Sequence, residues 1–215
     1  MIKGQLRYVR GSGNSEYEMD DWKMTTERKI LIGTAGMPGA GKDTVKKVVQ
    51  KLGLPVVVMG DEVRSEAKRK GLAITPENLG EVMLEMRKKE GPAAVAKRCI
   101  PKIKSTESSV IFIDGIRSLH EIEEFKKEFP DFRILAVHAS PKTRFKRLLK
   151  RGRKDDPQSW EGFVKRDRRE LKVGLGDVIA TADYMLINEG TKRELETKLM
   201  RLLRREVKEI WSSRR

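Results

Sequence analysis

A glycine-rich segment directly after a short apolar run places the strongest constraint on how this chain folds. The run from Ile30 to Thr34 is followed by three glycines, a lysine and a helical pattern, which predicts a strand, a phosphate-binding loop and a helix. Residues without a Cβ let backbone N–H groups converge on phosphate oxygens, and the helix adds the positive end of its dipole. The expected nucleotide-binding residues of this loop are Gly36, Pro38, Gly39, Ala40, Gly41, Lys42, Asp43 and Thr44.

Asp43 departs from the general pattern, because most phosphate loops carry at this position the Ser or Thr that holds magnesium. The segment Gly36 to Thr44 resembles the Gly-x-Pro-Gly-x-Gly-Lys-x-Thr loop of adenylate kinase and related nucleoside monophosphate kinases, which usually have glycine there. Two interpretations of the carboxylate are open. It interacts with the dipole of the first helical turn, worth about 0.3 to 1 kcal/mol, or it binds a magnesium-bound water and so belongs to the metal site.

The length of 215 residues suits one domain, with room for a small inserted module. No apolar stretch approaches the roughly 18 to 20 residues of a membrane span, and the start lacks the pattern of a secretory signal. We therefore expect a cytoplasmic monomer that does not enter a membrane. The single cysteine, Cys99, excludes an intrachain disulfide framework.

The formal net charge of +15 indicates an anionic partner. Residues 142–172 contain 13 Lys and Arg against 5 Asp and Glu, a surplus of +8 that supplies about half of the total. Such a concentration is typical of a surface that binds polyphosphate. Nucleic acid is an alternative partner, which we favour less than a phosphorylated small molecule.

From Ile30 onward, strand-like runs alternate with helical patterns, which predicts an α/β fold with a parallel, doubly wound sheet. The resemblance to adenylate kinases implies five strands in the order 2-3-1-4-5. It also implies a helical acceptor-binding module at 61–104 and a short lid at 150–170 within a kinase domain spanning 29–215. Residues 1–28 contain a linker-like segment and are expected to form a flexible extension. The predicted strands are Ile30 to Thr34, Pro55 to Met59, Val110 to Ile113, Arg133 to His138 and Tyr184 to Ile187.

Two strand ends resemble the acceptor side of adenylate kinases. The second strand leads into Gly-Asp-x-x-Arg, so that Asp61 and Arg64 are the expected substrate-binding residues; the alternative is a helix-capping Asp61 and a solvated Arg64. The third strand ends in Asp114, in the manner of a Walker B carboxylate that orients magnesium. Arg117 follows in a corner one residue shorter than the Asp-Gly-x-Pro-Arg of the family, and is expected to bind the acceptor and take part in catalysis.

Arginines follow in the helix and lid after the fourth strand. Their arrangement resembles that of adenylate kinases, and arginine suits the task because its planar fork bridges two phosphate oxygens. A solvated basic helix is the alternative. Further on, Ala182 to Thr191 resembles a segment of dephospho-CoA kinases, in which Asn188 either borders the adenine site or ends a strand. The resemblance gives Arg151, Arg153 and Arg166 catalytic roles and gives Arg147 and Asn188 nucleotide-binding roles. Lys42 of the loop is also expected to take part in catalysis.

Taken over residues 29–205, the sequence resembles an archaeal group of adenylate-kinase-related or dephospho-CoA-kinase-like P-loop kinases. This resemblance implies transfer of a phosphoryl group from ATP, with Mg²⁺, to a nucleotide-like acceptor, foremost a nucleoside monophosphate. Phosphorylation of the ribose hydroxyl of dephospho-CoA is one alternative. A P-loop nucleotide sensor or nucleic-acid-associated NTPase is another, for which the basic charge is the argument.

Overall fold

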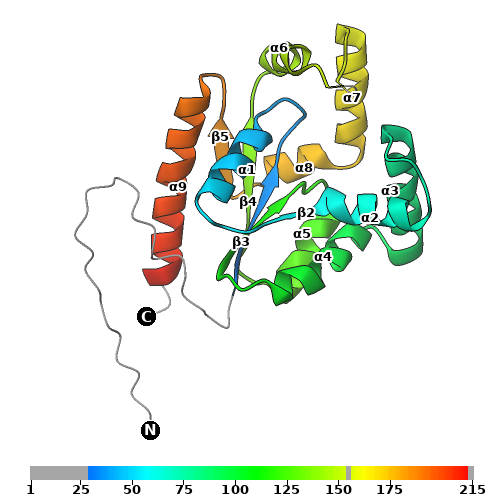
Figure 1. Ribbon diagram of the computed structural model, residues 1–215. Coiled ribbons are helices and arrows are strands. Elements are labelled where there is room, and N and C mark those ends of the chain that lie inside the picture. The colour runs from blue at the N-terminus through cyan, green and yellow to red at the C-terminus, as the bar shows by residue number, and fades with distance from the viewer. Residues whose placement is uncertain (1–28, 154–155, 213–215) are drawn as a thin grey trace.

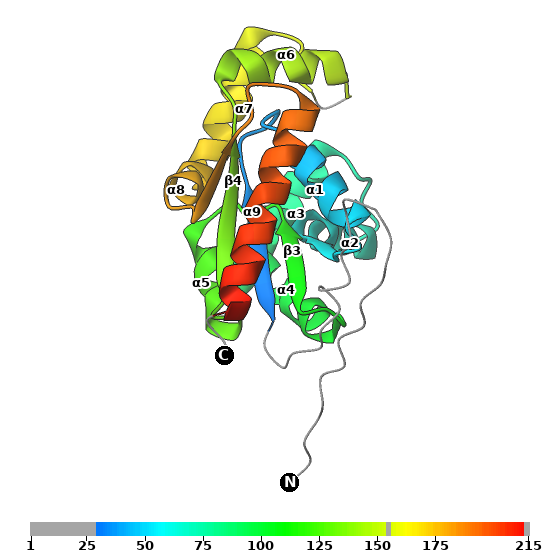
Figure 2. The same ribbon diagram turned by 90° about the vertical axis from the view of Figure 1, so that its left-hand side faces the viewer.

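The computed structural model describes residues 29–153 and 156–212, and its centre is a five-stranded parallel sheet (Figures 1 and 2). The strand order is β2-β3-β1-β4-β5, which confirms the predicted fold class. All four neighbouring pairs are parallel. The strands are β1 (Ile30–Ala35), β2 (Val56–Val58), β3 (Val110–Asp114), β4 (Phe132–His138) and β5 (Tyr184–Ile187).

The apolar runs of the sequence become the inner strands because both faces of the sheet are covered. Every residue of β1 is buried, and so are the first four of β3. On one face the core is formed with α1 (Lys42–Lys51) and α9 (Lys192–Ser212). On the other face it is formed with α4 (Ala94–Ser105), α5 (Leu119–Glu128) and α8 (Leu175–Ala180).

Two helices extend the second face beyond β2: α2 (Met59–Arg69) and α3 (Pro76–Glu90), which pack on α4. The breaks between these helices fall at Gly71 and Gly91, whose φ angles of +70° and +92° lie in the region that favours glycine. The region predicted as a helical module at 61–104 is therefore helical from residue 59 to 105 apart from these two turns. Its role in binding an acceptor remains a prediction.

The remaining helices, α6 (Pro141–Arg151) and α7 (Trp160–Lys172), lie beyond the ends of β1 and β4 at which the strands finish (Figures 1 and 2). Phe145 of α6 contacts Trp160 and Phe163 of α7, with ring centroids 5.3 and 5.4 Å apart. This aromatic packing joins α6, where the predicted lid at 150–170 begins, to α7, where it ends.

The extension at 1–28 and residues 154–155 of the predicted lid lie outside the described residues. In the part of the chain that is described, no helix combines the length and apolar character needed to cross a membrane.

Candidate nucleotide-binding site

The parallel sheet brings the predicted site residues to one edge, because all five strands finish there. The phosphate loop leaves β1 directly after Ala35, and Asp114 is the last residue of β3. Thr34 and Asp114 are paired in the register of β1 and β3. The loop and the carboxylate therefore lie on neighbouring strands, as the sequence predicted.

The backbone of the loop is held close to its neighbours, and glycine is needed for this. A Cβ on Gly39 would lie 2.8 Å from the carbonyl oxygen of Arg144, and one on Gly41 would lie 2.3 Å from Nδ2 of Asn188. Both glycines have positive φ, +81° and +116°. Asn188, which is buried, donates from this Nδ2 to the carbonyl oxygen of Ala40 at 2.7 Å. The residue directly after β5 thus supports the backbone of the loop.

Lys42 opens α1 and donates from Nζ to the carbonyl oxygen of Gly36, so that its side chain folds back over the loop. Burial lowers the pKa of Lys42 to about 8, an effect that Asp114 opposes and the cationic Arg117 increases. Glu170 and Asp43 also act on this ammonium group by raising its pKa. A cation with this depressed pKa favours an anionic ligand, because the ligand restores the stability of the charged form.

Asp114 is fixed from two sides. Thr34 donates from Oγ1 to Oδ1 of Asp114 at 3.1 Å, and Nζ of Lys46 lies 3.9 Å from Oδ2. A carboxylate held at a strand end next to a phosphate loop fits the chemistry of Mg²⁺, which is bound by one or two carboxylates together with phosphates and water. Among the described residues no three His, Cys, Asp or Glu side chains gather as an all-protein metal site. The donor set therefore fits an ion that arrives with the nucleotide.

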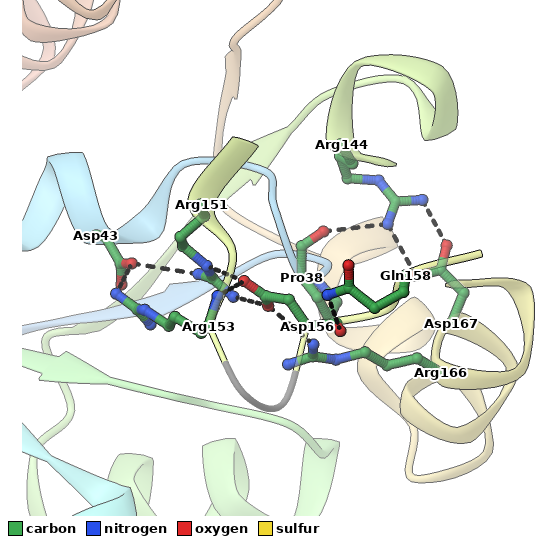
Figure 3. A network of polar contacts seen from close by, with 9 residues as sticks. All are labelled: Pro38, Asp43, Arg144, Arg151, Arg153, Asp156, Gln158, Arg166 and Asp167. Atoms are coloured by element: carbon green, nitrogen blue, oxygen red, sulfur yellow. Dashed lines mark hydrogen bonds and ion pairs between the residues drawn. The ribbon is translucent and has the colours of Figure 1, made fainter. Parts of the chain in front are cut away.

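Three of the predicted arginines meet at one carboxylate, that of Asp156 (Figure 3). Arg151 donates to both of its oxygens, Arg166 donates to Oδ1 at 3.3 Å, and the backbone N–H of Arg153 donates to Oδ2 at 3.1 Å. The side chain of Asp156 is fully buried, and the hydrogen bonds from Arg151 lower its pKa. Asp156 therefore positions the guanidinium groups of Arg151 and Arg166 and the backbone of Arg153.

Asp43 lies at the mouth of the loop and contacts two of the same arginines. Its Oδ2 is 3.0 Å from Nη2 of Arg153 and 3.4 Å from Nη1 of Arg151 (Figure 3). The side chain of Asp43 is 56% exposed. The contacts seen here are with guanidinium groups, and its membership of a metal site remains a prediction.

Arg147 and Arg144 of α6 have other partners. Arg147 donates to the carbonyl oxygens of Asn188 and Gly190 at 2.9 and 3.2 Å, and thereby joins α6 to the turn after β5. Arg144 is buried, donates to the carbonyl oxygen of Pro38 at 3.2 Å and forms a bidentate pair with Asp167. Nucleotide binding by Arg147 stays a prediction, while Arg144 connects α7 to the phosphate loop.

The predicted acceptor-binding residues have more exposed side chains than Asp156, which is fully buried. Asp61 and Arg64 form an ion pair one turn apart on α2, with side chains 47% and 42% exposed. Arg117 is 46% exposed, and its Nε lies 3.9 Å from Oε2 of Glu170, a buried residue of α7. The structure thus places Asp61 and Arg64 after β2 and Arg117 after β3, and pairs each arginine with a carboxylate.

Several residues of this site have no predicted role in the sequence, among them Arg144, Asp156 and Glu170. Arg144 is one of several basic residues on its helix, and Asp156 lies in an Arg-Lys-Asp-Asp segment, so neither position alone indicates its partner. Acidic residues in a strongly basic stretch were a usable signal, because a carboxylate among arginines often organises them. Nothing in the sequence separates Glu170 from the other charged residues of its helix.

The fold and the loop define a P-loop protein. A family model described as "AAA domain" matches residues 35–163, from the end of β1 to α7. A UPF0200 protein of Hyperthermus butylicus is 47% identical over 182 residues, which are 85% of this chain and 97% of the relative. One from Staphylothermus marinus is 53% identical over 165 residues, 77% of this chain and 86% of the relative. The chain belongs to the UPF0200 family.

Solved structures share the fold at low identity. TT1252 from Thermus thermophilus has a TM-score of 0.60 at 20% identity, with 83% of this chain and 98% of that chain covered. A shikimate kinase from Bacteroides thetaiotaomicron has a TM-score of 0.56 at 16% identity, with 81% and 97% covered. A gluconokinase from Sinorhizobium meliloti has a TM-score of 0.52 at 12% identity, with 87% and 99% covered. At such identities the likeness is one of fold.

Proposed function

We propose that this protein transfers the γ-phosphoryl group of ATP to a small nucleotide-like acceptor, with a nucleoside monophosphate as the first expectation. The observation that supports this most is the convergence of three separate elements at one edge of the sheet. They are Lys42 in the phosphate loop, Asp114 at the end of β3, and the arginines that Asp156 assembles between α6 and α7. Phosphoryl transfer needs this combination, because its transition state is stabilised by positioned charge rather than by covalent chemistry.

In this proposal each group has a separate task. The loop amides and Lys42 bind the phosphates of the donor, and Asp114 orients Mg²⁺, which supplies neutralisation of phosphate charge when bound. Arg151, Arg153 and Arg166 surround the transferring group. The helices α6 and α7 also exclude water from the transferring group, because hydrolysis of the donor competes with transfer.

Arg64 and Arg117 support a monophosphate acceptor, since both extend from strand ends adjacent to Asp114. Arg64 is paired with Asp61, and both side chains are exposed, whereas Arg117 is exposed and its Nε lies 3.9 Å from the buried Glu170. An incoming phosphate can replace Asp61 as the partner of Arg64, because exposed ion pairs contribute only about 0 to 1 kcal/mol. The proposal includes the assignment of this protein to the adenylate-kinase-related branch of the P-loop kinases.

Phosphorylation of a hydroxyl, as in dephospho-CoA kinases, is the second candidate, and Glu170 favours it. This buried carboxylate lies beside Arg117 and acts electrostatically on Lys42. A carboxylate at this place suits an acceptor that presents a hydrogen-bond donor, such as a ribose hydroxyl, because burial of a charge without full pairing is costly. It suits a second anionic group less well.

A direct assay separates these candidates and also the nucleotide-sensor alternative. ADP release from ATP is measured with the protein alone, with each nucleoside monophosphate, and with dephospho-CoA, and the phosphorylated product is identified by mass. The proposal expects release that depends on an acceptor. Release without any acceptor, or release stimulated only by nucleic acid, would instead identify an NTPase of the sensor class.

A further inference from the structure

Asp43 is the residue of the phosphate loop whose chemistry the proposed reaction does not yet use. It stands next to Lys42, where a hydroxyl residue is usual, and it places a negative charge at a site meant for polyphosphate. Its two contacts are with Arg151 and Arg153 (Figure 3). These are two of the arginines assigned to the transferring phosphoryl group.

The two carboxylates that bind these arginines differ in burial. The Asp156 side chain is 0% exposed and accepts from Arg151, Arg166 and the backbone of Arg153. The Asp43 side chain is 56% exposed, and its Arg153 partner is 55% exposed. Breaking a buried pair leaves a charge without compensation, whereas an exposed pair separates at little cost. Asp156 is therefore the permanent partner, and Asp43 is the exchangeable one.

The geometry also separates Asp43 from Asp114, the carboxylate predicted to orient magnesium. Asp114 is held by Thr34 and Lys46, on the side of the loop that faces β3. Asp43 instead faces the segment after α6 (Figure 3). Oδ2 of Asp43 accepts from both arginines, and a phosphate oxygen is likewise a charged acceptor for guanidinium N–H groups. Asp43 thus offers the arginines what a phosphate group would offer.

We propose that Asp43 is a positioning residue that holds Arg151 and Arg153 at the loop in the absence of nucleotide and exchanges them for phosphate oxygens when nucleotide binds. This inference rests on the proposed function, because it requires the loop to bind a nucleoside triphosphate. Asp43 competes with the ligand for the two arginines. Removing its charge therefore strengthens phosphate binding, while binding of Mg²⁺ is unaffected.

The experiment compares the wild-type protein with Asp43→Asn by calorimetric titration with a non-hydrolysable ATP analogue, once with Mg²⁺ and once with EDTA. We expect the dissociation constant of Asp43→Asn to fall about two- to fivefold under both conditions, as for loss of an exposed ion pair. Weaker binding that appears only with Mg²⁺ would overturn the proposal in favour of a metal-bound water. An unchanged constant under both conditions would overturn it as well.

A double-mutant cycle with Arg153→Gln distinguishes competition from simple repulsion between Asp43 and the phosphates. If Asp43 acts through Arg153, the gain from Asp43→Asn falls to less than half in the Arg153→Gln background. A gain of the same size in both backgrounds indicates repulsion alone and rejects the proposal. Glu123→Gln on α5 is the matched control, because it also removes one exposed negative charge, and the partner of Glu123 is His120 of its own helix rather than an arginine of the site. It should leave the dissociation constant unchanged.

Two further measurements distinguish loss of folding or of nucleotide binding from an effect of Asp43 alone. The melting temperature of each variant without ligand shows that it is folded before the titration. The wild-type titration tests the proposed function separately, because a wild-type protein that binds no nucleotide with or without Mg²⁺ refutes nucleotide binding itself. A wild-type protein that binds nucleotide, together with an Asp43→Asn variant that gains nothing, refutes only the role of Asp43.

Discussion

The proposed donor and acceptor sides of this site are built in different ways. On the donor side, the loop is anchored by Asn188 at the carbonyl of Ala40 and by Arg144 at the carbonyl of Pro38, and both anchoring residues are buried. On the acceptor side, Arg64 pairs with a residue one turn away on its own helix, and about 40% of its side chain is exposed. Long-range contacts of buried residues hold the first side, whereas Arg64 on the second side is held by a local, exposed ion pair.

The difference in burial predicts different kinetic roles for the two sides in the proposed reaction. Preorganised groups stabilise charge that develops in a transition state without first being rearranged. Exposed groups that have one partner contribute mainly to ligand binding, and a different acceptor can form different contacts with them. Substitutions on the donor side should therefore lower turnover, and substitutions on the acceptor side should raise the Michaelis constant of the acceptor.

The largest effect is expected from Lys42→Ala, which removes the cation of the loop. Loss of one preorganised donor to transition-state charge costs about 100- to 1,000-fold in turnover. Steady-state kinetics with the acceptor found in the ADP-release assay measure this loss. A variant that retained turnover while losing only ATP affinity would show that the donor side binds rather than catalyses.

A smaller effect is expected from Asp156→Asn, which leaves Arg151 and Arg166 without their shared carboxylate. Hydrogen bonds to a charged group contribute about 1.5 to 3 kcal/mol each, so both stability and turnover should fall, the latter by about tenfold or more. Denaturant unfolding and kinetics measure the two losses. Glu161→Gln, an exposed change of the same charge on α7, is the control: it should leave turnover unchanged and lower stability only by the about 0.3 to 1 kcal/mol of a first-turn carboxylate.

Next in size are the acceptor arginines. Arg64→Ala should raise the acceptor Michaelis constant about tenfold and leave ATP binding nearly intact, because a charge-assisted contact of about 1.4 kcal/mol corresponds to that factor. Arg117→Ala should change both turnover and the Michaelis constant, since Arg117 also acts on Lys42. If both variants leave acceptor saturation unchanged, the monophosphate-kinase proposal fails and only the ATP site remains.

The same contrast explains what could be predicted from the sequence. Strand positions, strand order and the loop follow from local apolar runs, glycine spacing and a family resemblance. The structure confirms the order and has each strand within one residue of its predicted bounds, with Met59, predicted in the second strand, opening α2 instead. Asn188 was considered as an adenine neighbour or a strand-end residue, yet its amide bonds to Ala40, 148 residues earlier. The pairing of Arg144 with Asp167, and of Arg151 with Asp156, likewise depends on how α6 and the segment after it pack. Local patterns identify such residues as charged but not their partners.

The smallest expected effect is a pH dependence that reports how dry the donor side is before nucleotide binds. Burial lowers the pKa of Lys42 from 10.5 in the unfolded chain to about 8. Between these values the unfolded state binds more protons than the folded state, so this group makes stability rise as pH increases from about 8 to 10.5. Bound phosphate favours the ammonium form and raises the pKa again.

Binding of ADP in EDTA at pH 9 should therefore take up a fraction of one proton, whereas binding at pH 7 should take up almost none at this group. Calorimetry in buffers of different ionisation enthalpy measures the uptake. Lys42→Arg is the matched control, because a guanidinium stays protonated over the whole range and should abolish the uptake at pH 9. Equal uptake in both proteins would show that Lys42 is already charged and hydrated before ADP arrives. The donor side would then be no more preorganised at this residue than the acceptor side is at Arg64.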